Sequence, residues 1–357
     1  MGQSIAAKRS LRFAALAAGV GGALLFLWSI RAAGASAVRD GVGRIGWWFV
    51  VICLLGGIRY VLRAVAWRMC LDDPSRLPLG SAFGAAVMGD ALGNVTPFGV
   101  LVSEPSKVAF VHRRVGPASA ISAVTVENLF YIASVAIVFV CGTAALLLSF
   151  DVGVALRRTA YVTLGVAIGF ALLVLVTLVR RVRVASALVT MLESWQPLRR
   201  LARGRRTDVT SIEDQVFGFA SRHPGRLAPL VALEAAYHLT GVLEIWLTVT
   251  LIAGAPVAFI TAFVLEFVNR TITIAFQFVP MWLGVDEAGT GAVATALQLG
   301  GATGVGLALV RKARVVVWTS LGLGLFFLSR SWRQMSTPET GHARAFTRAA
   351  AVRDRTF

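Results

Sequence analysis

The fold is decided by Pro97-Phe-Gly99-Val-Leu-Val-Ser-Glu104 and by Pro280-Met-Trp-Leu-Gly284-Val-Asp286-Glu287. In both stretches a proline precedes a glutamate by seven residues, and a glycine lies between them. Each stretch follows an apolar arm that contains an asparagine, Asn94 or Asn269, and each is followed by a short arm and a longer apolar span. Because proline and glycine interrupt helices, each stretch predicts the tip of a helical hairpin.

Composition indicates that these hairpins lie in a membrane. The 357 residues are 57% hydrophobic and only 15% charged, against roughly 25% charged in soluble domains. Apolar runs of about 20 residues are typical of transmembrane helices. We therefore expect an all-α, polytopic integral membrane protein with these apolar runs: Leu11–Ile30, Gly46–Val65, Leu79–Val95, Ala118–Phe150, Tyr161–Val179, Leu227–Ala253, Ala258–Val279 and Ala288–Leu328.

The net charge of +17 does not indicate nucleic-acid binding. That function needs a basic face in solution, whereas most of the charge here lies between apolar runs, where it sets topology. Cys53, Cys70 and Cys141 lack the spacing of metal ligands and are predicted to be small buried hydrophobes. No nucleotide-binding or nucleophile motif is present, so we expect no cofactor and no metal.

The charge distribution predicts which segments face the cytoplasm of a bacterial-type inner membrane. The Arg180–Arg226 loop, with an amphipathic helix near Ala185–Trp195, is expected there together with both termini. The charges of the other loops fit this orientation only if residues 79–114 and 258–302 each enter the membrane and return to the same side. This topology has about six full spans and two re-entrant hairpins. Full crossing of 258–302 is the alternative, since Ala288–Val310 is free of charge.

The two hairpins start on opposite sides of the membrane in this topology, so they define inverted repeats, a common architecture of secondary transporters. Repeat one covers about 79–150 and repeat two about 258–328. Non-helical backbone at membrane depth survives only within protein or beside a wet cavity. The two tips are therefore expected to meet around a polar site, within one transmembrane domain over 1–330. The basic tail 331–357 is expected to be disordered.

Ionisable residues in apolar segments are the candidate site, because charge at membrane depth costs at least ~2.5 kcal/mol. The tip acids Glu104, Asp286 and Glu287 fit a substrate site, and they also fit helix N-capping. The basic cluster at 311–314 fits an anionic head group, since guanidinium groups bind phosphate oxygens well. The alternative for that cluster is snorkelling to the membrane interface.

Four further pairs follow from spacing. Matching positions in the two repeats predict a charge pair between Glu127 and Arg311. Arg59 and Arg63 lie one helical turn apart at the end of a span, and snorkelling is the preferred interpretation of this pair.

Two of the pairs join an acid to a basic residue four positions later on one helix. Glu266 and Arg270 are predicted to form a structural ion pair. Glu234 and His238 are predicted to be a packed polar pair rather than a metal site.

Two motifs resemble a known family. The stretch from Gly93 to Lys107, and the stretch from Phe278 to Gly289 followed by Ala308–Arg314, resemble the flippase-like transmembrane region of lysylphosphatidylglycerol synthases, with the second stretch similar to hopanoid-biosynthesis-associated members. The resemblance covers roughly 10–330 and implies a protein that translocates or handles lipid. The soluble aminoacyl-transfer domain of the full synthases is not expected here. Met281-Trp282 departs from the small, glycine-rich tip usual in the family, which puts substrate identity in doubt.

We therefore expect a flippase-like carrier, not an enzyme, that moves an amphiphilic, anionic lipid through a midplane cavity. A membrane-embedded transferase and an accessory scaffold of lipid biosynthesis are the alternatives. The expected partners are a membrane lipid and no nucleic acid, with lipid-biosynthesis enzymes and further copies of the chain as candidates. The candidate substrate-binding residues are Asn94, Pro97, Gly99, Glu104, Glu127, Asn128, Asn269, Arg270, Pro280, Gly284, Asp286, Glu287, Arg311, Lys312 and Arg314.

Overall fold

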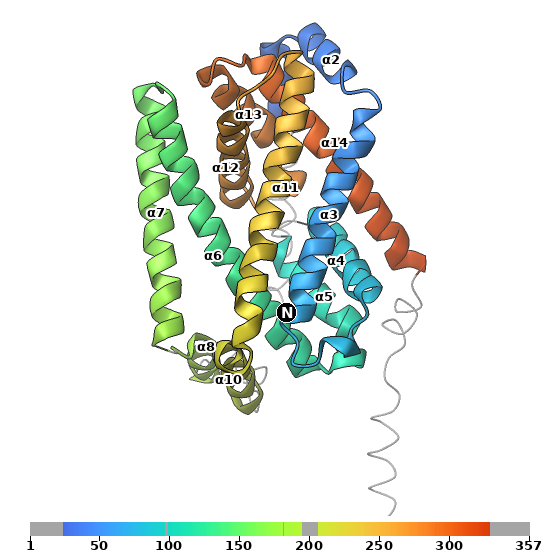
Figure 1. The fold of residues 1–357 in the computed structure, drawn as a ribbon, viewed down its shortest axis with the longest axis vertical. Coiled ribbons are helices and arrows are strands. Elements are labelled where there is room, and N and C mark those ends of the chain that lie inside the picture. The colour runs from blue at the N-terminus through green and yellow to red at the C-terminus, as the bar shows by residue number, and fades with distance from the viewer. Residues whose placement is uncertain (1–23, 97–98, 181, 195–205, 329–357) are drawn as a thin grey trace, which may run out of the picture.

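The computed structural model describes residues 24–96, 99–180, 182–194 and 206–328, and within them the regular structure is entirely helical (Figure 1). Apart from Leu11–Ile30, which lies largely outside the described residues, the predicted apolar runs reappear as helices, and the last run divides into two helices. The α-helices are α2 (Ala35–Gly43), α3 (Trp48–Met69), α4 (Leu79–Asn94), α5 (Val100–Val115), α6 (Pro117–Ser149), α7 (Val154–Val179), α8 (Val184–Ser194), α10 (Arg206–Arg222), α11 (Leu227–Ala253), α12 (Phe259–Ala275), α13 (Val285–Ala296) and α14 (Gly301–Leu328).

Four helices in the described part of the chain are long and apolar enough to cross a bilayer: α3, α6, α7 and the helix that ends at Ala253. The 28 residues of α14 also suffice for a crossing, but basic residues interrupt its middle. The predicted first span, Leu11–Ile30, lies largely outside the described residues, as does the tail 331–357. Large apolar side chains such as Val162, Val166 and Leu173 are exposed on α7, as expected for a surface that faces lipid.

Both predicted hairpins are present. α4 and α5 pack along each other, as do α12 and α13. At the first tip, Gly99 approaches Gly93 so closely that a Cβ on Gly99 would lie 2.5 Å from the Gly93 carbonyl oxygen. The second tip has Gly284 at φ +81°, a backbone conformation that favours glycine. Both tips therefore depend on a glycine that spacing had singled out.

The helices of the second hairpin are short. α13 has 12 residues and α12 has 17, compared with the roughly 17 that a span needs. The charge-free run from 288 to 310 is not one helix, because Gln298 (φ +61°) and Gly300 (φ +82°) break it. In Figure 1 the α12–α13 hairpin occupies the upper half of the bundle and the α4–α5 hairpin the lower half.

The helices pack in two matching sets, α3 to α6 and α11 to α14. α4 packs on α14 as α12 packs on α6, and α3 contacts α6 as α11 contacts α14. The remaining cross-contact, α3 on α14, is matched by α11 on α6, and the counterparts α3 and α11 pack on each other. Since α6 runs upward in Figure 1 and α14 runs downward, the two sets have opposite directions. This arrangement agrees with an inverted repeat that also includes α3 and α11.

Glycines allow the closest of these cross-contacts. A Cβ on Gly142 of α6 would lie 2.5 Å from the Phe267 side chain of α12. A Cβ on Gly322 of α14 would lie 2.5 Å from the Val87 carbonyl oxygen of α4. Each hairpin's first arm is thus pressed against a glycine of the long helix from the other set, which holds the two sets together by close packing.

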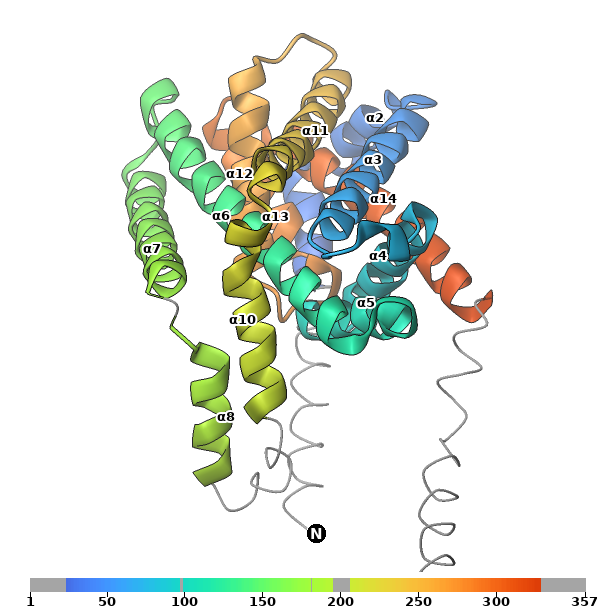
Figure 2. The ribbon, with the colours of Figure 1, turned by 60° about the horizontal axis from the view of Figure 1, so that its bottom comes forward.

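Two segments between the predicted apolar runs are partly helical. Residues 31–44 contain α2, which packs on α14. The 180–226 stretch contains α10, which packs on α6 and buries Phe219. Figure 2 shows α8 and α10 projecting together from the lower end of the bundle. α8 lies where the amphipathic helix was predicted, although Trp195 falls outside the described residues.

Candidate functional site

The second hairpin carries a compact ion-pair cluster between α13 and α14. Asp286 accepts a hydrogen bond of 2.6 Å from Arg311 Nη2, which also lies 2.7 Å from the Thr290 hydroxyl. Glu287 is fully buried and forms an ion pair with Lys312 through Oε1. Its Oε2 accepts from the Gly284 backbone N–H at 2.8 Å. Glu287 therefore caps its helix, as the sequence allowed, and is charge-paired with Lys312 as well.

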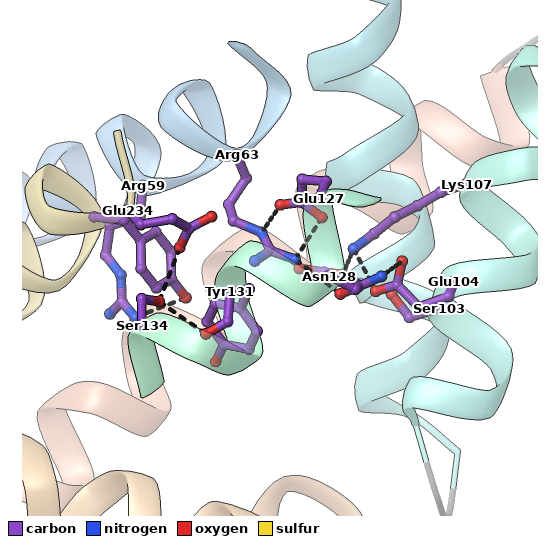
Figure 3. Close-up of polar contacts among 12 residues, drawn as sticks. Arg59, Arg63, Ser103, Glu104, Lys107, Glu127, Asn128, Tyr131, Ser134 and Glu234 are labelled. Carbon is purple, nitrogen blue, oxygen red and sulfur yellow. Dashed lines mark hydrogen bonds and ion pairs between the residues drawn. The ribbon is translucent and has the colours of Figure 1, made fainter. Parts of the chain in front are cut away.

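The first hairpin carries a second cluster, shown in Figure 3. Lys107 Nζ lies 2.9 Å from Asp90 of α4 and 3.0 Å from Glu104. Glu104 also accepts from Asn128 Nδ2 of α6 at 3.1 Å. Arg63 of α3 pairs with Glu127, with 2.8 Å between its Nε and Oε1. Polar contacts therefore connect four helices around this hairpin.

The two clusters share one pattern of hydrogen bonding. In each set, the long helix after the hairpin donates a hydrogen bond to the hairpin glutamate: Asn128 to Glu104 and Lys312 to Glu287. The donors follow their glutamates by 24 and 25 residues. One donor is neutral and the other is charged, and the glutamates differ accordingly. The side chain of Glu104 is 22% exposed, whereas that of Glu287 is 0% exposed.

Two sequence-based predictions about arginines are wrong. Glu127 and Arg311 do not pair; among the described residues, Glu127 binds Arg63 and Arg311 binds Asp286. Each finds its partner within its own set of helices: that of Glu127 lies on α3 and that of Arg311 on α13. Arg59 does not snorkel outward, and neither does Arg63: their side chains are 12% and 16% exposed and form ion pairs inside the bundle.

A third group of charges, which we call the arginine–tyrosine centre, lies between the two hairpins. It comprises Arg59 and Arg63 of α3, Tyr131 of α6, Tyr237 of α11 and Arg270 of α12. The guanidinium carbon of Arg63 lies 4.3 Å from the Tyr131 ring centroid, and that of Arg59 lies 4.5 Å from the Tyr237 centroid. The Tyr237 hydroxyl accepts from Arg59 and the Tyr131 hydroxyl from Arg270, both at 2.9 Å.

Carboxylates surround this centre. The predicted pair of Glu266 and Arg270 is confirmed, with 2.9 Å between Oε1 and Nε. Glu244 of α11 binds Arg314 of α14 at 2.7 Å and lies 3.7 Å from Arg59. α11 and α14 are thereby joined through the interior of the bundle.

The other predicted polar residues make local or supporting contacts. Asn94 donates to the Thr319 hydroxyl of α14 at 3.0 Å, whereas Asn269 donates within its own helix to Glu266 at 3.4 Å. The matching of the two asparagines therefore does not extend to their contacts. The expected packed pair on α11 is present: the Ser134 hydroxyl lies within hydrogen-bond distance of both Glu234 and His238. Among the described residues, no cluster of histidine, cysteine and acidic side chains could hold a metal ion.

The tip residues shape the hairpins rather than line them with charge. Pro97 lies outside the described residues, and Pro280 begins a short 3-10 turn that ends at Trp282. Trp282 has φ +51° and donates its indole N–H to the Thr273 carbonyl oxygen at 3.0 Å. The tryptophan that departs from the family pattern thus ties the tip back to α12, and its strained backbone is held by that bond.

Several residues of the site were not predicted. Lys107 was part of a quoted motif, and its position three residues after Glu104 was an available signal for an ion pair. Asp90 was not among the candidates, although a lone charge in the apolar run Leu79–Val95 was an available signal. Tyr131 and Tyr237 gave no signal, because a tyrosine in an apolar run is unremarkable until tertiary packing places arginines over its ring.

A narrow crevice reaches the first cluster. Its lining includes Arg63, Trp67, Glu104, Lys107 and Glu127. It has room for about one water molecule. A larger group could enter only if side chains moved, and Glu104 is the more exposed of the two hairpin glutamates.

These features define a polytopic helical membrane protein with two opposed hairpins and an ion-paired interior. The chain belongs to the family described as the lysylphosphatidylglycerol synthase transmembrane region, whose profile matches residues 12–324. The family places this integral membrane protein in lipid metabolism. No curated protein and no solved structure was found to match the chain. The association with the hopanoid type of member stays a prediction.

Proposed function

We propose that this protein is a flippase-like carrier that moves an amphiphilic lipid with an anionic head group across the bilayer. One observation carries the proposal: acids and bases from both hairpins and both long helices are buried in the interior of an apolar bundle. Each such charge is costly at membrane depth, and charges of this kind mark substrate pathways. Membership of the family supports a lipid as the substrate.

The opposed hairpins supply a route for alternating access. The α4–α5 hairpin would open a path from one leaflet and the α12–α13 hairpin from the other, by movement of one set of helices against the other. The interior observed here is closed around its own ion pairs, so entry of a head group would exchange some of them for contacts to the lipid.

The three clusters would have different roles. Glu287 and Lys312 would hold the second hairpin in shape, since both are deeply buried and one of them also caps a helix. Glu104 would exchange its partners more easily, because it is partly exposed and bonded to a neutral asparagine. Lys107 and Arg63, released from acids, would then be able to contact an anionic head group.

The test is lipid translocation in proteoliposomes. Fluorescent phospholipid is reconstituted in both leaflets, and a membrane-impermeant reductant destroys the label that reaches the outer leaflet. Wild-type protein is expected to expose nearly all of the label, and protein-free vesicles about half. Glu104→Gln should slow the exposure at least ~10-fold, because loss of its charge changes the balance at Lys107.

The control is the double variant Arg183→Gln/Asp214→Asn, which removes an exposed ion pair of 2.7 Å between α8 and α10. It should translocate lipid as fast as wild type. Translocation equal to that of empty vesicles would overturn the carrier proposal. A new lipid product seen by mass spectrometry, and absent for Glu104→Gln, would favour the transferase instead.

The predicted surroundings of the carrier remain proposals: a bacterial-type inner membrane, cytoplasmic termini, neighbouring lipid-biosynthesis enzymes and self-association. Cross-linking in native membranes, followed by identification of the captured proteins, would test the last two. The absence of any cross-linked enzyme or second copy would contradict them.

A further inference from the structure

We infer that the arginine–tyrosine centre binds the phosphate group of the lipid head group. The inference rests on the proposed function and adds to it a place within the protein for the phosphate of the head group. The centre lies outside the hairpin tips on which the sequence prediction concentrated, and it draws residues from α3, α6, α11 and α12.

The first support is convergence. The guanidinium of Arg63 comes from one set of helices and that of Arg270 from the other, yet both lie over the same two rings. Arg63 is 4.3 Å from the Tyr131 centroid and 5.8 Å from the Tyr237 centroid. For Arg270 the corresponding distances are 6.0 and 5.3 Å. Three guanidinium groups, counting Arg59, thus surround one pair of tyrosines.

The second support is unused hydrogen-bonding capacity. Arg270 is 8% exposed, and its Nη2 donates to no acceptor among the described residues. Arg63 Nη1 is likewise buried without an acceptor in the part of the chain that the structure describes. Buried donors in native proteins are almost always satisfied, so each of these N–H groups calls for an acceptor. A single water molecule would satisfy one of them, whereas the several oxygens of a phosphate can accept from two guanidinium groups at once.

The charges around the centre are balanced. Arg59, Arg63, Arg270 and Arg314 face four carboxylates: those of Glu127, Glu244 and Glu266 form ion pairs with them. The fourth carboxylate, that of Glu234, accepts from the Ser134 hydroxyl and lies close enough to Arg63 and Arg270 to interact with both electrostatically. A phosphodiester would therefore take the place of a carboxylate at the guanidinium groups rather than neutralise a surplus of positive charge.

Other clusters fit a phosphate less well. Arg311 also has unpartnered nitrogens, but its Nη2 is already held by Asp286 and Thr290 between two packed helices. Lys107 lies between two carboxylates. Arg63, in contrast, lines the crevice at the first hairpin, which has room for about one water molecule, so a head group would reach the centre through movement of the surrounding side chains.

The experiment measures binding rather than transport, so it can fail or succeed independently of the carrier proposal. Purified full-length protein in detergent is titrated with short-chain phosphatidylglycerol, with the matching diacylglycerol, and with inorganic phosphate, and binding is followed by calorimetry. Phosphatidylglycerol is expected to bind and diacylglycerol to bind at least ~10-fold more weakly. Competition by inorganic phosphate would show that free phosphate also enters; its absence would assign the site to lipid.

Paired substitutions keep the interior free of orphan charges. Arg270→Gln/Glu266→Gln and Arg63→Gln/Glu127→Gln should each weaken phosphatidylglycerol binding at least ~10-fold while the protein stays folded by size-exclusion chromatography. Arg183→Gln/Asp214→Asn should bind like wild type. Equal binding of diacylglycerol, or folded double variants with wild-type affinity, would overturn the inference. Should either variant fail to fold, Tyr131→Leu, which removes the ring beneath Arg63, is expected to show the same loss, and wild-type binding by that variant would refute it.

Discussion

The Glu287–Lys312 ion pair should be one of the strongest single contacts in the protein. Glu287 is 0% exposed and the Lys312 side chain 12% exposed. Glu287→Gln keeps the shape and can still accept from the Gly284 N–H through its amide oxygen. It leaves the Lys312 ammonium buried without a counter-charge, which costs about 3–5 kcal/mol. Lys312→Met strands the carboxylate and should cost about the same.

The double variant is expected to be far milder than the sum of the two. Two uncharged side chains in an apolar interior replace a buried pair at a cost of roughly 0–2 kcal/mol, so the coupling energy should reach about 3 kcal/mol or more. Equilibrium unfolding in mixed micelles measures all four proteins. The exposed pair of Arg157 and Asp151, at 3.3 Å, is the control and should show coupling below about 0.5 kcal/mol. Additive effects of the two substitutions would refute the reasoning.

Other predictions follow from packing, topology and charge. Gly322→Ala should destabilise the protein by about 1–3 kcal/mol, because its Cβ would lie 2.5 Å from the Val87 carbonyl oxygen. Gly324→Ala, two residues further along α14 and with open space around it, is the control and should stabilise the protein by up to about 1 kcal/mol. Similar melting temperatures for the two variants would contradict this prediction. A cysteine at Thr303, in a background without Cys53, Cys70 and Cys141, should react with an impermeant reagent from the side of α2 and not from the side of α10; the reverse would exclude the re-entrant second hairpin. Exchange of charges in Arg63→Glu/Glu127→Arg should recover part of the stability that either reversal loses, and no recovery would show that their 2.8 Å contact contributes little. Trp282→Phe should cost about 1 kcal/mol by removing the indole bond to Thr273, and an unchanged melting temperature would contradict that role.

Local sequence signals predicted most of the helices. The apolar run at 227–253 matches α11 residue for residue, and Pro117 begins α6 as expected of a proline in the first turn. These features depend on neighbouring residues alone, since an apolar run of sufficient length and a helix breaker act locally. The loops were less predictable: α10 is held by burial of Phe219 against other helices, which no local signal reports.

The candidate site was predicted only in part. The acids at the tips and the basic residues of α14 were identified because charges in apolar runs stand out. Their partners were not, because α-helices that pack together bring residues into contact from far apart in the chain. Asp286 and Arg311 pair because α13 packs against α14, whereas Glu127 of α6 pairs with Arg63 of α3, so the expected pair of Glu127 and Arg311 is replaced by one partner for each within its own set of helices.

The order of apolar runs, the two breaker motifs with their glutamates, and the charge asymmetry of the loops are properties of the chain itself, and they determined that this is a helical membrane protein with two hairpins. Only the tertiary structure decided that Arg59 and Arg63 point inward, that two tyrosines lie beneath three guanidinium groups, and that the hairpin glutamates differ in burial. The physical reason is that helix formation and membrane insertion depend on the local run of residues, whereas the partner of a buried charge depends on which helix face packs beside it.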